Sequence, residues 1–250
     1  IYSKYALNDV RSLFQIIHEY PLKGKPPMMT HIFEDIKKNR IIAAKGAPEA
    51  IIRNSNLSEV DKCKLNKIIK AFGSNGYRVL GVAKACFESN HFPTNQEDFA
   101  FEFLGLAVFN DPPKKGINKV VQQIYDAGIE LKVITGDNAD TTNAIALQSG
   151  IKNHSPVVNG NEVAALREVE LQTLAPKTTI FTRMFPEAKL AVVNALKKNG
   201  AVVAMLGDGV NDAPALKSAH IGVAMGTRGT EIAKAAADLV ITNDNLEKLI

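Results

Sequence analysis

The sequence predicts an α/β protein in which a Rossmann-like parallel sheet follows a smaller α+β region. From Phe101 onward, short apolar runs alternate with stretches of helical periodicity, the order typical of βα units in a parallel sheet. Before residue 100, two apolar runs are joined by a charged turn, as in a β-hairpin. A length of 250 residues suffices for two domains, and we place them at residues 1–100 and 101–250.

In the first region, helical periodicity predicts a helix over residues 1–20. The apolar residues on one face of this helix are Val10, Leu13, Phe14 and Ile17. The hairpin strands are predicted at residues 28–33 and 40–44. Three further segments complete the region: a helix over residues 59–75, a strand over 77–85 and a polar linker over 87–99.

In the second region, five apolar runs are predicted to be strands: residues 101–109, 131–134, 179–182, 201–206 and 221–225. Helices are predicted over residues 117–128, 139–149 and 186–199. The last of these has Pro186 at its start and Gly200 just beyond its end, the expected placement of proline and glycine. Pro214 opens a further short helix that ends before His220.

Composition excludes several classes of protein. The net charge of +4 is small for this length, and no basic run is interleaved with aromatic residues, so we expect no nucleic-acid partner. Cys63 and Cys86 form no CxxC pair, which fits a reduced, cytosolic compartment. No apolar run approaches the roughly 18 residues that a membrane-spanning helix needs, and we find no signal peptide.

Residues 201–226 contain the strongest chemical signal. An apolar run, expected to be a buried strand, is followed within six positions by Gly207, Asp208, Gly209, Asn211 and Asp212. Such a loop at the carboxyl edge of a parallel sheet is typical of a binding site. Carboxylates there are hard oxygen ligands, suited to Mg²⁺ beside a phosphate. The alternative is a turn whose residues only supply positive φ angles, but a turn needs fewer special residues.

Three other patterns have weaker signals when read alone. Thr135-Gly136-Asp137 stands between a predicted strand and helix, where a hydroxyl and free N–H groups suit a phosphoryl oxygen. The alternative is a helix cap supplied by Asp137 or Thr141. Lys45, at the end of a predicted strand, and Lys189, in a predicted helix, could each be an ordinary surface lysine.

The stretch from Met205 to Gly226 resembles the hinge-loop signature of the P-type cation-transporting ATPases, which belong to the haloacid dehalogenase-like phosphotransferases. Other segments resemble motifs of the same family in the same order, over about residues 19–250. These are KGAPE at 45–49, GYRVL at 76–80, DPP at 111–113, TGD at 135–137, RxxPxxK at 183–189 and the tail at 242–245. Their order and spacing are similar to those of the calcium- and plasma-membrane-type branch.

The resemblance implies ATP and Mg²⁺ as cofactors and a role for each matching residue. The residues implied to hold nucleotide and phosphate are Lys45, Arg78, Thr135, Gly136, Asp137, Arg183 and Lys189. The residues implied to be catalytic are Thr135, Lys189, Asp208, Asn211 and Asp212, with Mg²⁺ held by Asp208 and Asp212. One stretch departs from the family, because Leu22 and Pro27 stand where an aromatic residue for adenine and a lysine are usual.

The resemblance further implies a multi-pass membrane pump that moves a cation, with calcium favoured, through an aspartyl-phosphate intermediate. The 250 residues would lie on its cytoplasmic side, working with actuator and membrane domains. No Asp here is followed by Lys-Thr-Gly, so we expect the nucleophile to precede Ile1. We therefore expect a gap in the sheet beside residues 131–135 and 201–206. Because the strands at this gap lack a neighbour, we expect the 250 residues to be only marginally stable alone. Because the nucleophile is missing, we expect them to have no turnover of ATP.

Three alternatives remain. A soluble haloacid dehalogenase-like phosphatase would need a DxD nucleophile motif, which is absent. A dinucleotide-binding module would need a third glycine where Asp212 stands. A non-catalytic fragment that only binds nucleotide would show all the motifs of this chain, and only the upstream sequence would distinguish it.

Overall fold

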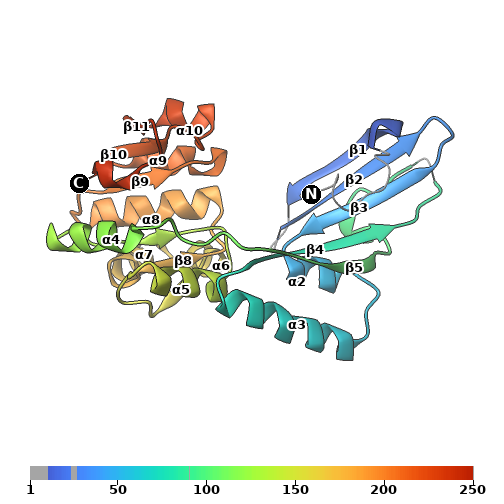
Figure 1. Cartoon of the computed structure of the whole chain (residues 1–250), viewed down its shortest axis with the longest axis horizontal. Helices are drawn as coiled ribbons and strands as arrows, with labels where there is room; N and C mark the ends of the chain where they lie inside the picture. Colours follow the sequence, from blue (N-terminus) through green and yellow to red (C-terminus); the bar gives the residue numbers. More distant parts are fainter. Residues whose placement is uncertain (1–10, 24–26, 90, 250) are drawn as a thin grey trace. The chain divides into compact units, whose positions relative to one another are not determined.

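A computed structural model describes residues 11–23, 27–89 and 91–249. The chain forms two compact units, Ile1–Phe72 with Tyr77–Asn110, and Gly73–Gly76 with Asp111–Ile250 (Figure 1). The first unit is built on an antiparallel sheet, and the second on two short parallel sheets. The mixed α/β class predicted from the sequence is confirmed.

The first unit contains a five-stranded antiparallel sheet in the order β1-β2-β3-β4-β5. Its strands are β1 (Phe14–Lys23), β2 (Met28–Asp35), β3 (Arg40–Gly46), β4 (Arg78–Ala85) and β5 (Glu102–Phe109). The hairpin of β2 and β3 is confirmed, with Glu34 opposite Arg40. β5 pairs with β4, so the first strand of the predicted alternating region belongs to this antiparallel sheet.

The helix predicted over residues 1–20 is wrong where the structure describes it. A single 3-10 turn, η1 (Arg11–Leu13), leads into β1, and residues 1–10 lie outside the described part. β1 pairs with β2 from Phe14 opposite Asp35 to Lys23 opposite Met28. Pairing with the next strand therefore overrides the helical spacing of the apolar residues.

Helices α2 (Pro48–Arg53) and α3 (Glu59–Ser74) complete the first unit. Among the described residues of 87–99, the only helical element is the 3-10 turn η2 (Gln96–Asp98). The helix predicted over residues 59–75 and the irregular linker are confirmed. α2 packs closely on β4, because a Cβ at Gly81 would lie 2.7 Å from the Cβ of Ile51. The core contains fully buried side chains from β2, β3, α2 and the residue before β5: Ile32, Ile42, Ile51 and Phe101.

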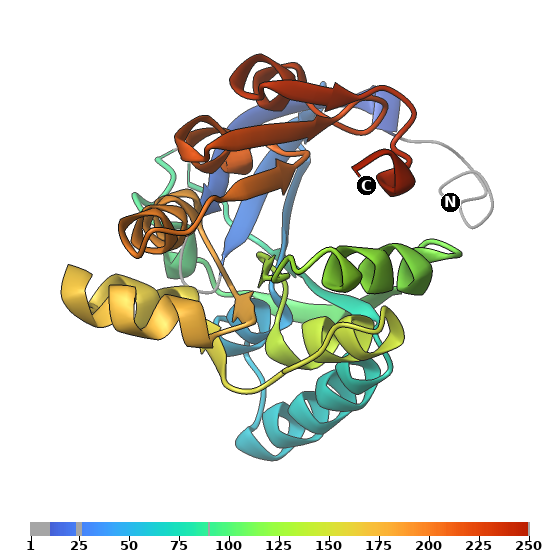
Figure 2. The same ribbon diagram turned by 90° about the vertical axis from the view of Figure 1, so that its left-hand side faces the viewer.

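The second unit contains two three-stranded parallel sheets. In the first, β6 (Val133–Ile134), β8 (Ile180–Thr182) and β7 (Val157–Asn159) follow the order β6-β8-β7. In the second, β11 (Leu239–Ile241), β10 (Ile221–Met225) and β9 (Ala204–Gly207) lie side by side in that order (Figure 2). β6 and β9 are each edge strands among the described residues, as expected for a sheet interrupted between them. The strand predicted over 201–206 is shorter than expected and not buried throughout, since Leu206 is 39% exposed.

The α-helices that pack around these sheets are α4 (Ile117–Asp126), α5 (Ala139–Gln148), α6 (Gly160–Ala165), α7 (Glu168–Leu174), α8 (Pro186–Lys198), α9 (Ala213–Ser218) and α10 (Glu231–Ala236). No sequence pattern described above predicts α6, α7, α10, β7 or β11. α8 lies between the two sheets (Figure 1). Its Val192 packs in the core that contains Phe181, and its Val193 packs in the core that contains Met205. Within the described residues, no helix is both long and apolar enough to span a membrane.

Candidate active site

The loop after β9 presents an exposed carboxylate at the carboxyl edge of its sheet. Asp208 follows the strand directly, and η4 (Val210–Asp212) then leads into α9. Asp208 and Asn211 are exposed, whereas Asp212 is buried. Among the described residues, no side-chain hydrogen bond or ion pair involves the carboxylate of Asp208. Its oxygens are therefore accessible to a cation such as Mg²⁺.

The carboxylate of Asp212 is already engaged by three donors. Its Oδ1 accepts a hydrogen bond from Lys189 Nζ at 2.6 Å, and its Oδ2 accepts from the backbone N–H groups of Asp208 at 3.2 Å and Gly209 at 3.0 Å. A side chain at Gly207 would obstruct this arrangement, because its Cβ would lie 2.6 Å from the Cβ of Asp212. Asp212 therefore anchors the loop that carries Asp208.

Lys189 reaches this loop from α8. Pro186 is the first residue of α8, which follows β8 closely and directs Lys189 towards the second sheet. The side chains of Lys189 and Asp212 are only 11% and 10% exposed, so their ion pair is largely excluded from water. The pair joins the helix after one parallel sheet to the loop after the other.

Thr135, Gly136, Asp137 and Arg183 are neighbours where β6 and β8 end. The N–H of Asp137 donates to Thr135 Oγ1 at 3.1 Å, and the N–H of Arg183 donates to the carbonyl of Asp137 at 2.9 Å. Arg183 itself has a positive φ of 50°. The chain after β8 lies directly against Gly160, where a Cβ would be 2.4 Å from the Arg183 carbonyl oxygen.

The N-cap of α5 is neither Asp137 nor Thr141, the two residues suggested by the sequence. Asn138 is the N-cap, and its side-chain oxygen accepts a hydrogen bond from the N–H of Thr141 at 2.9 Å. The alternative reading of Asp137 or Thr141 as the cap is therefore wrong. Asn138 fills this role because an Asx side chain reaches the N–H of the third helical residue. Capping thus does not account for Asp137 at this position.

Lys45 and Arg78 lie on the same face of the first unit's sheet. Lys45 on β3 stands opposite Val82 on β4, and Arg78 is four positions before Val82 on the same strand. Because side chains alternate along a strand, Val82 and Arg78 point to one face, and Gly81 points to the other face, against α2. Lys45 and Arg78 are both exposed. The structure thus gathers these two cationic residues on the face opposite α2.

Leu22 and Pro27, which stand where the family usually has an aromatic residue and a lysine, lie on or beside the first two strands. Leu22 is 57% exposed on β1, and Pro27 precedes β2. The nearby aromatic residue on β1 is Tyr20, which no sequence motif above includes. Tyr20 is buried, its hydroxyl donates to the carbonyl of Pro93 at 2.5 Å, and its ring packs against Phe99. Tyr20 therefore acts as a core residue here.

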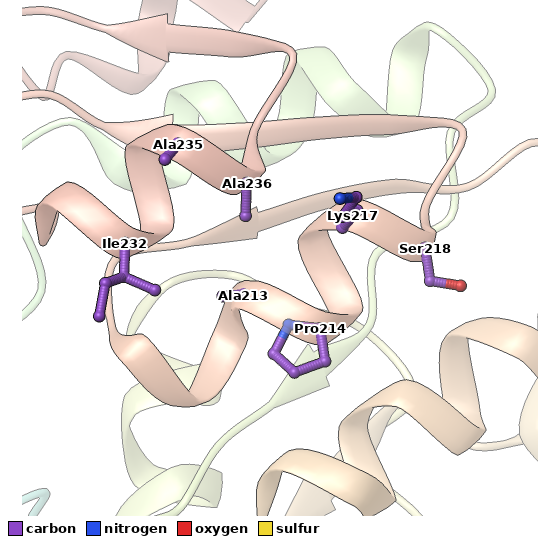
Figure 3. A pocket seen from close by; sticks show the side chains of 7 residues that line it. All are labelled: Ala213, Pro214, Lys217, Ser218, Ile232, Ala235 and Ala236. Atoms are coloured by element: carbon purple, nitrogen blue, oxygen red, sulfur yellow. The ribbon is translucent and has the colours of Figure 1, made fainter.

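A shallow groove of about 560 Å³ lies between α9 and α10 (Figure 3). Its lining residues are Ala213, Pro214, Lys217, Ser218, Ile232, Ala235 and Ala236. None of the predicted site residues lines this groove. Apart from Lys217 and Ser218, its lining is apolar.

Comparison with known proteins relates most of the chain to one protein family. A protein-family model for haloacid dehalogenase-like hydrolases matches residues 23–220. The chain is 34% identical to calcium-transporting ATPase 1 of Saccharomyces cerevisiae over 265 residues, covering 99% of this chain and 28% of that protein.

Two further relatives have related names. The calcium-transporting ATPase of Bacillus subtilis is 34% identical over 248 residues, which cover 94% of this chain and 28% of that protein. The sodium/potassium exporting P-type ATPase cta3 of Schizosaccharomyces pombe is 32% identical over 266 residues, covering 98% of this chain and 26% of that protein. The chain therefore spans roughly a quarter of the length of these relatives.

Proposed function

Since the chain belongs to the haloacid dehalogenase-like hydrolases and is similar along most of its length to cation-transporting P-type ATPases, we propose that it is the nucleotide-binding and phosphorylation part of an ATP-driven cation pump. The observation that carries this proposal is the exposed Asp208 carboxylate, held at a sheet edge by the buried pair of Lys189 and Asp212. In that arrangement, the loop after β9 offers a carboxylate for a metal ion, and α8 offers a lysine for a phosphoryl group.

In this proposal Asp208 holds Mg²⁺, with Asn211 beside it. The fit rests on an exposed carboxylate that lies at the end of a parallel strand and whose oxygens have no side-chain partner among the described residues. When bound, Mg²⁺ would neutralise and orient phosphate oxygens. Asp212 belongs to the same site, but its engaged oxygens favour a role in orienting the loop over direct metal binding. When phosphate is bound, the Lys189 ammonium group would donate a hydrogen bond to a phosphoryl oxygen and weaken its bond to Asp212.

The remaining site residues divide between the two proposed domains. In the domain proposed at residues 101–250, the Thr135 hydroxyl and the Gly136 N–H would contact the phosphoryl group, and Asp137 and Arg183 would hold nucleotide. In the domain proposed at residues 1–100, Lys45 and Arg78 would bind ATP. Their shared position on one face of the sheet supports this assignment.

The covalent step needs an aspartate from elsewhere in the whole protein, because no Asp in this sequence is followed by Lys-Thr-Gly. Attack by its carboxylate oxygen on the γ-phosphorus of ATP would release ADP and form an aspartyl phosphate, which water would then hydrolyse. The open edges of β6 and β9 support a place for the strand that bears this aspartate. The 250 residues alone would then have no turnover.

We further propose that the whole protein is a multi-pass membrane protein and that these residues lie on its cytoplasmic side. They would work with actuator and membrane domains and would have no nucleic-acid partner. Calcium is the favoured cation, as the names of two relatives suggest, although a third relative is named for sodium and potassium export.

Transport by the full-length protein in sealed vesicles tests this proposal. We expect Mg²⁺ and ATP to drive accumulation of Ca²⁺ but not of Na⁺ or K⁺. Lys189→Met should abolish accumulation, whereas Lys119→Met, at an exposed position on α4, should leave it unchanged. ATP hydrolysis without accumulation of any cation would contradict the pump. Accumulation of Na⁺ alone would contradict only the choice of calcium.

A further inference from the structure

A buried carboxylate outside the predicted site holds a second loop of the same unit. Asp244 follows β11, is 6% exposed and has a positive φ of 53°. Its Oδ1 accepts a hydrogen bond from the N–H of Thr227, and its Oδ2 accepts one from the N–H of Arg228, both at 3.0 Å. Both carboxylate oxygens are therefore committed to the segment between β10 and α10.

That segment, residues 226–230, has little room to move. A Cβ at Gly226 would lie 2.6 Å from Thr242 Cα, and a Cβ at Gly229 would lie 2.0 Å from the carbonyl oxygen of Met225. The N–H of Gly226 also donates to the carbonyl of Ile241 at 2.9 Å. Because the backbone is packed this closely, we expect the position of Thr230 to depend on how residues 226–228 are held.

The far end of the segment contacts the candidate active site. The N–H of Thr230 donates to the carbonyl oxygen of Asp208 at 2.8 Å. The N–H of Asp208 donates to Asp212 on its other side. The peptide groups around Asp208 are thus fixed by two carboxylates, directly by Asp212 and through residues 226–230 by Asp244.

Asp244 is itself secured from a third direction. Lys114, which precedes α4, donates from its Nζ to the carbonyl oxygen of Asp244 at 2.6 Å. Burial raises the pKa of the Asp244 carboxyl, but the N–H groups of residues 226–228 and the charge of Lys114 outweigh it and hold the pKa below its usual 3.8. The carboxylate is therefore ionised at neutral pH.

We propose that Asp244 is a positioning residue for the metal site, which holds residues 226–230 against Asp208 and so fixes where the Asp208 carboxylate points. This inference rests on the proposed function, because it assigns Asp208 to Mg²⁺. An ionised carboxylate suits the role, since it accepts from two N–H groups at once, whereas an amide side chain accepts through one oxygen only. Asp also tolerates the left-handed backbone better than most residues.

The test compares Asp244→Asn with Asp238→Asn in the full-length protein. Asparagine keeps the left-handed conformation accessible, so Asp244→Asn should fold. Asp238 is a matched control, because its Oδ2 accepts from the N–H of Gly222 at 2.7 Å near the other end of β10, away from Asp208. Two quantities are measured: amide hydrogen exchange of residues 207–212, and the Mg²⁺ concentration that gives half-maximal phosphorylation from ATP.

For Asp244→Asn we expect both quantities to rise by roughly tenfold, the scale typical of residues that orient a metal ligand. Lys114→Met should shift both in the same direction by less than about tenfold, because it releases the Asp244 backbone carbonyl and leaves both hydrogen bonds to the carboxylate in place. Asp238→Asn should leave both at the wild-type values.

Faster exchange at residues 226–230 with unchanged exchange at residues 207–212 and an unchanged Mg²⁺ requirement would overturn the inference. An equal effect of Asp238→Asn would also overturn it, because general loss of stability would then explain the result. If the wild-type protein is not phosphorylated at any Mg²⁺ concentration, the proposed function fails, and hydrogen exchange alone decides whether Asp244 holds the Asp208 loop.

Discussion

At the scale of single residues, the Lys189–Asp212 pair determines how the candidate site is held before any phosphate binds. Burying two charges is costly unless each finds its partners. Asp212 meets that condition with one ammonium group and two backbone N–H groups. Removing one member would leave the other charge buried and uncompensated.

We predict that Asp212→Leu destabilises the second unit by about 3–5 kcal/mol, the range for breaking a buried pair from one side. The double variant Lys189→Met/Asp212→Leu should lose less, because no charge is left buried. Urea unfolding of all four members of this mutant cycle measures the difference. Lys198→Met removes an exposed pair with Glu168 and should change stability by less than about 1 kcal/mol. A double variant as unstable as the sum of the single variants would contradict this account.

A second residue-scale prediction concerns Glu34 in the first unit. Hydrogen bonds from Lys38 and Arg40 lower its pKa below the usual 4.5. Because the folded pKa lies below the unfolded value, Glu34 stabilises the unit above about pH 4.5, and that stabilisation is lost as the pH falls through the folded pKa. Glu34→Gln should therefore be less stable than wild type near pH 7, and the two stability curves should converge towards pH 2. Parallel curves in acid unfolding would show that the bonds to Glu34 do not contribute.

Single residues were predictable from the sequence where their chemistry was unusual for their position. Asp208 stood out in this way, whereas Lys189 was identified only through the resemblance of its motif to a known family. The bond between Lys189 and Asp212 was not predicted, because it joins two βα units whose spatial relation no local pattern contains. Asp244 and Thr230 were not predicted to support the site, since an Asp or Thr near a turn is common and its partners lie elsewhere in the chain.

At the scale of secondary-structure elements, strong local patterns were predicted well and weak ones were not. α3 has an amphipathic pattern of four turns, and its predicted bounds are nearly those observed. β1 was predicted as a helix, because its identity as a strand depends on pairing with β2. β7 and β11 are three-residue strands, too short for any periodicity to show. The role of Gly160 beside the site could not be predicted either, because it depends on a contact with Arg183, which is distant in the sequence.

The element-scale prediction is that Gly160→Ala displaces the turn after β8. The added methyl group would lie 2.4 Å from the Arg183 carbonyl oxygen, so either α6 or the turn must shift. We expect a loss of about 1–3 kcal/mol in unfolding free energy, as for overpacking elsewhere, together with weaker ATP binding. Ala164→Ser, at an exposed position on α6, is the matched control. Wild-type stability and ATP affinity in Gly160→Ala would show that the turn adapts without cost.

At the scale of the whole molecule, the two parallel sheets of the second unit each end in an open edge. The apolar runs before and in β6 and β9 are typical of a doubly wound sheet, and the absence of the strand that carries the nucleophile predicted a gap beside both of them. The structure gives each strand a single neighbour among the described residues. The open edges agree with the predicted gap, but the separation into two three-stranded sheets was not predicted, because pairing depends on which segments are present to fill each edge.

The corresponding prediction concerns the edge of β6. The N–H groups of Val133 and Thr135 donate to residues beside and in β8, at 2.8 Å and 2.9 Å. Because alternate residues of a strand bond to the same neighbour, the N–H of Ile134 faces the open edge. In the 250-residue chain, the Ile134 amide should exchange with solvent faster than those of Val133 and Thr135, as measured by NMR. In the full-length protein it should be protected. Equal protection of Ile134 and Val133 in the 250-residue chain would mean that this edge is not open.

The central claim is that Asp208 holds the magnesium of an aspartyl-phosphate pump. Its most direct test is Mg²⁺-dependent phosphorylation of the full-length protein by ATP labelled in the γ-phosphate, with Asp208→Asn beside it. We predict an acid-stable, hydroxylamine-labile label in the wild type that is lost in the variant. Nucleotide binding without any such label in the wild-type protein would contradict the claim, and the chain would then be a nucleotide-binding fold without the chemistry.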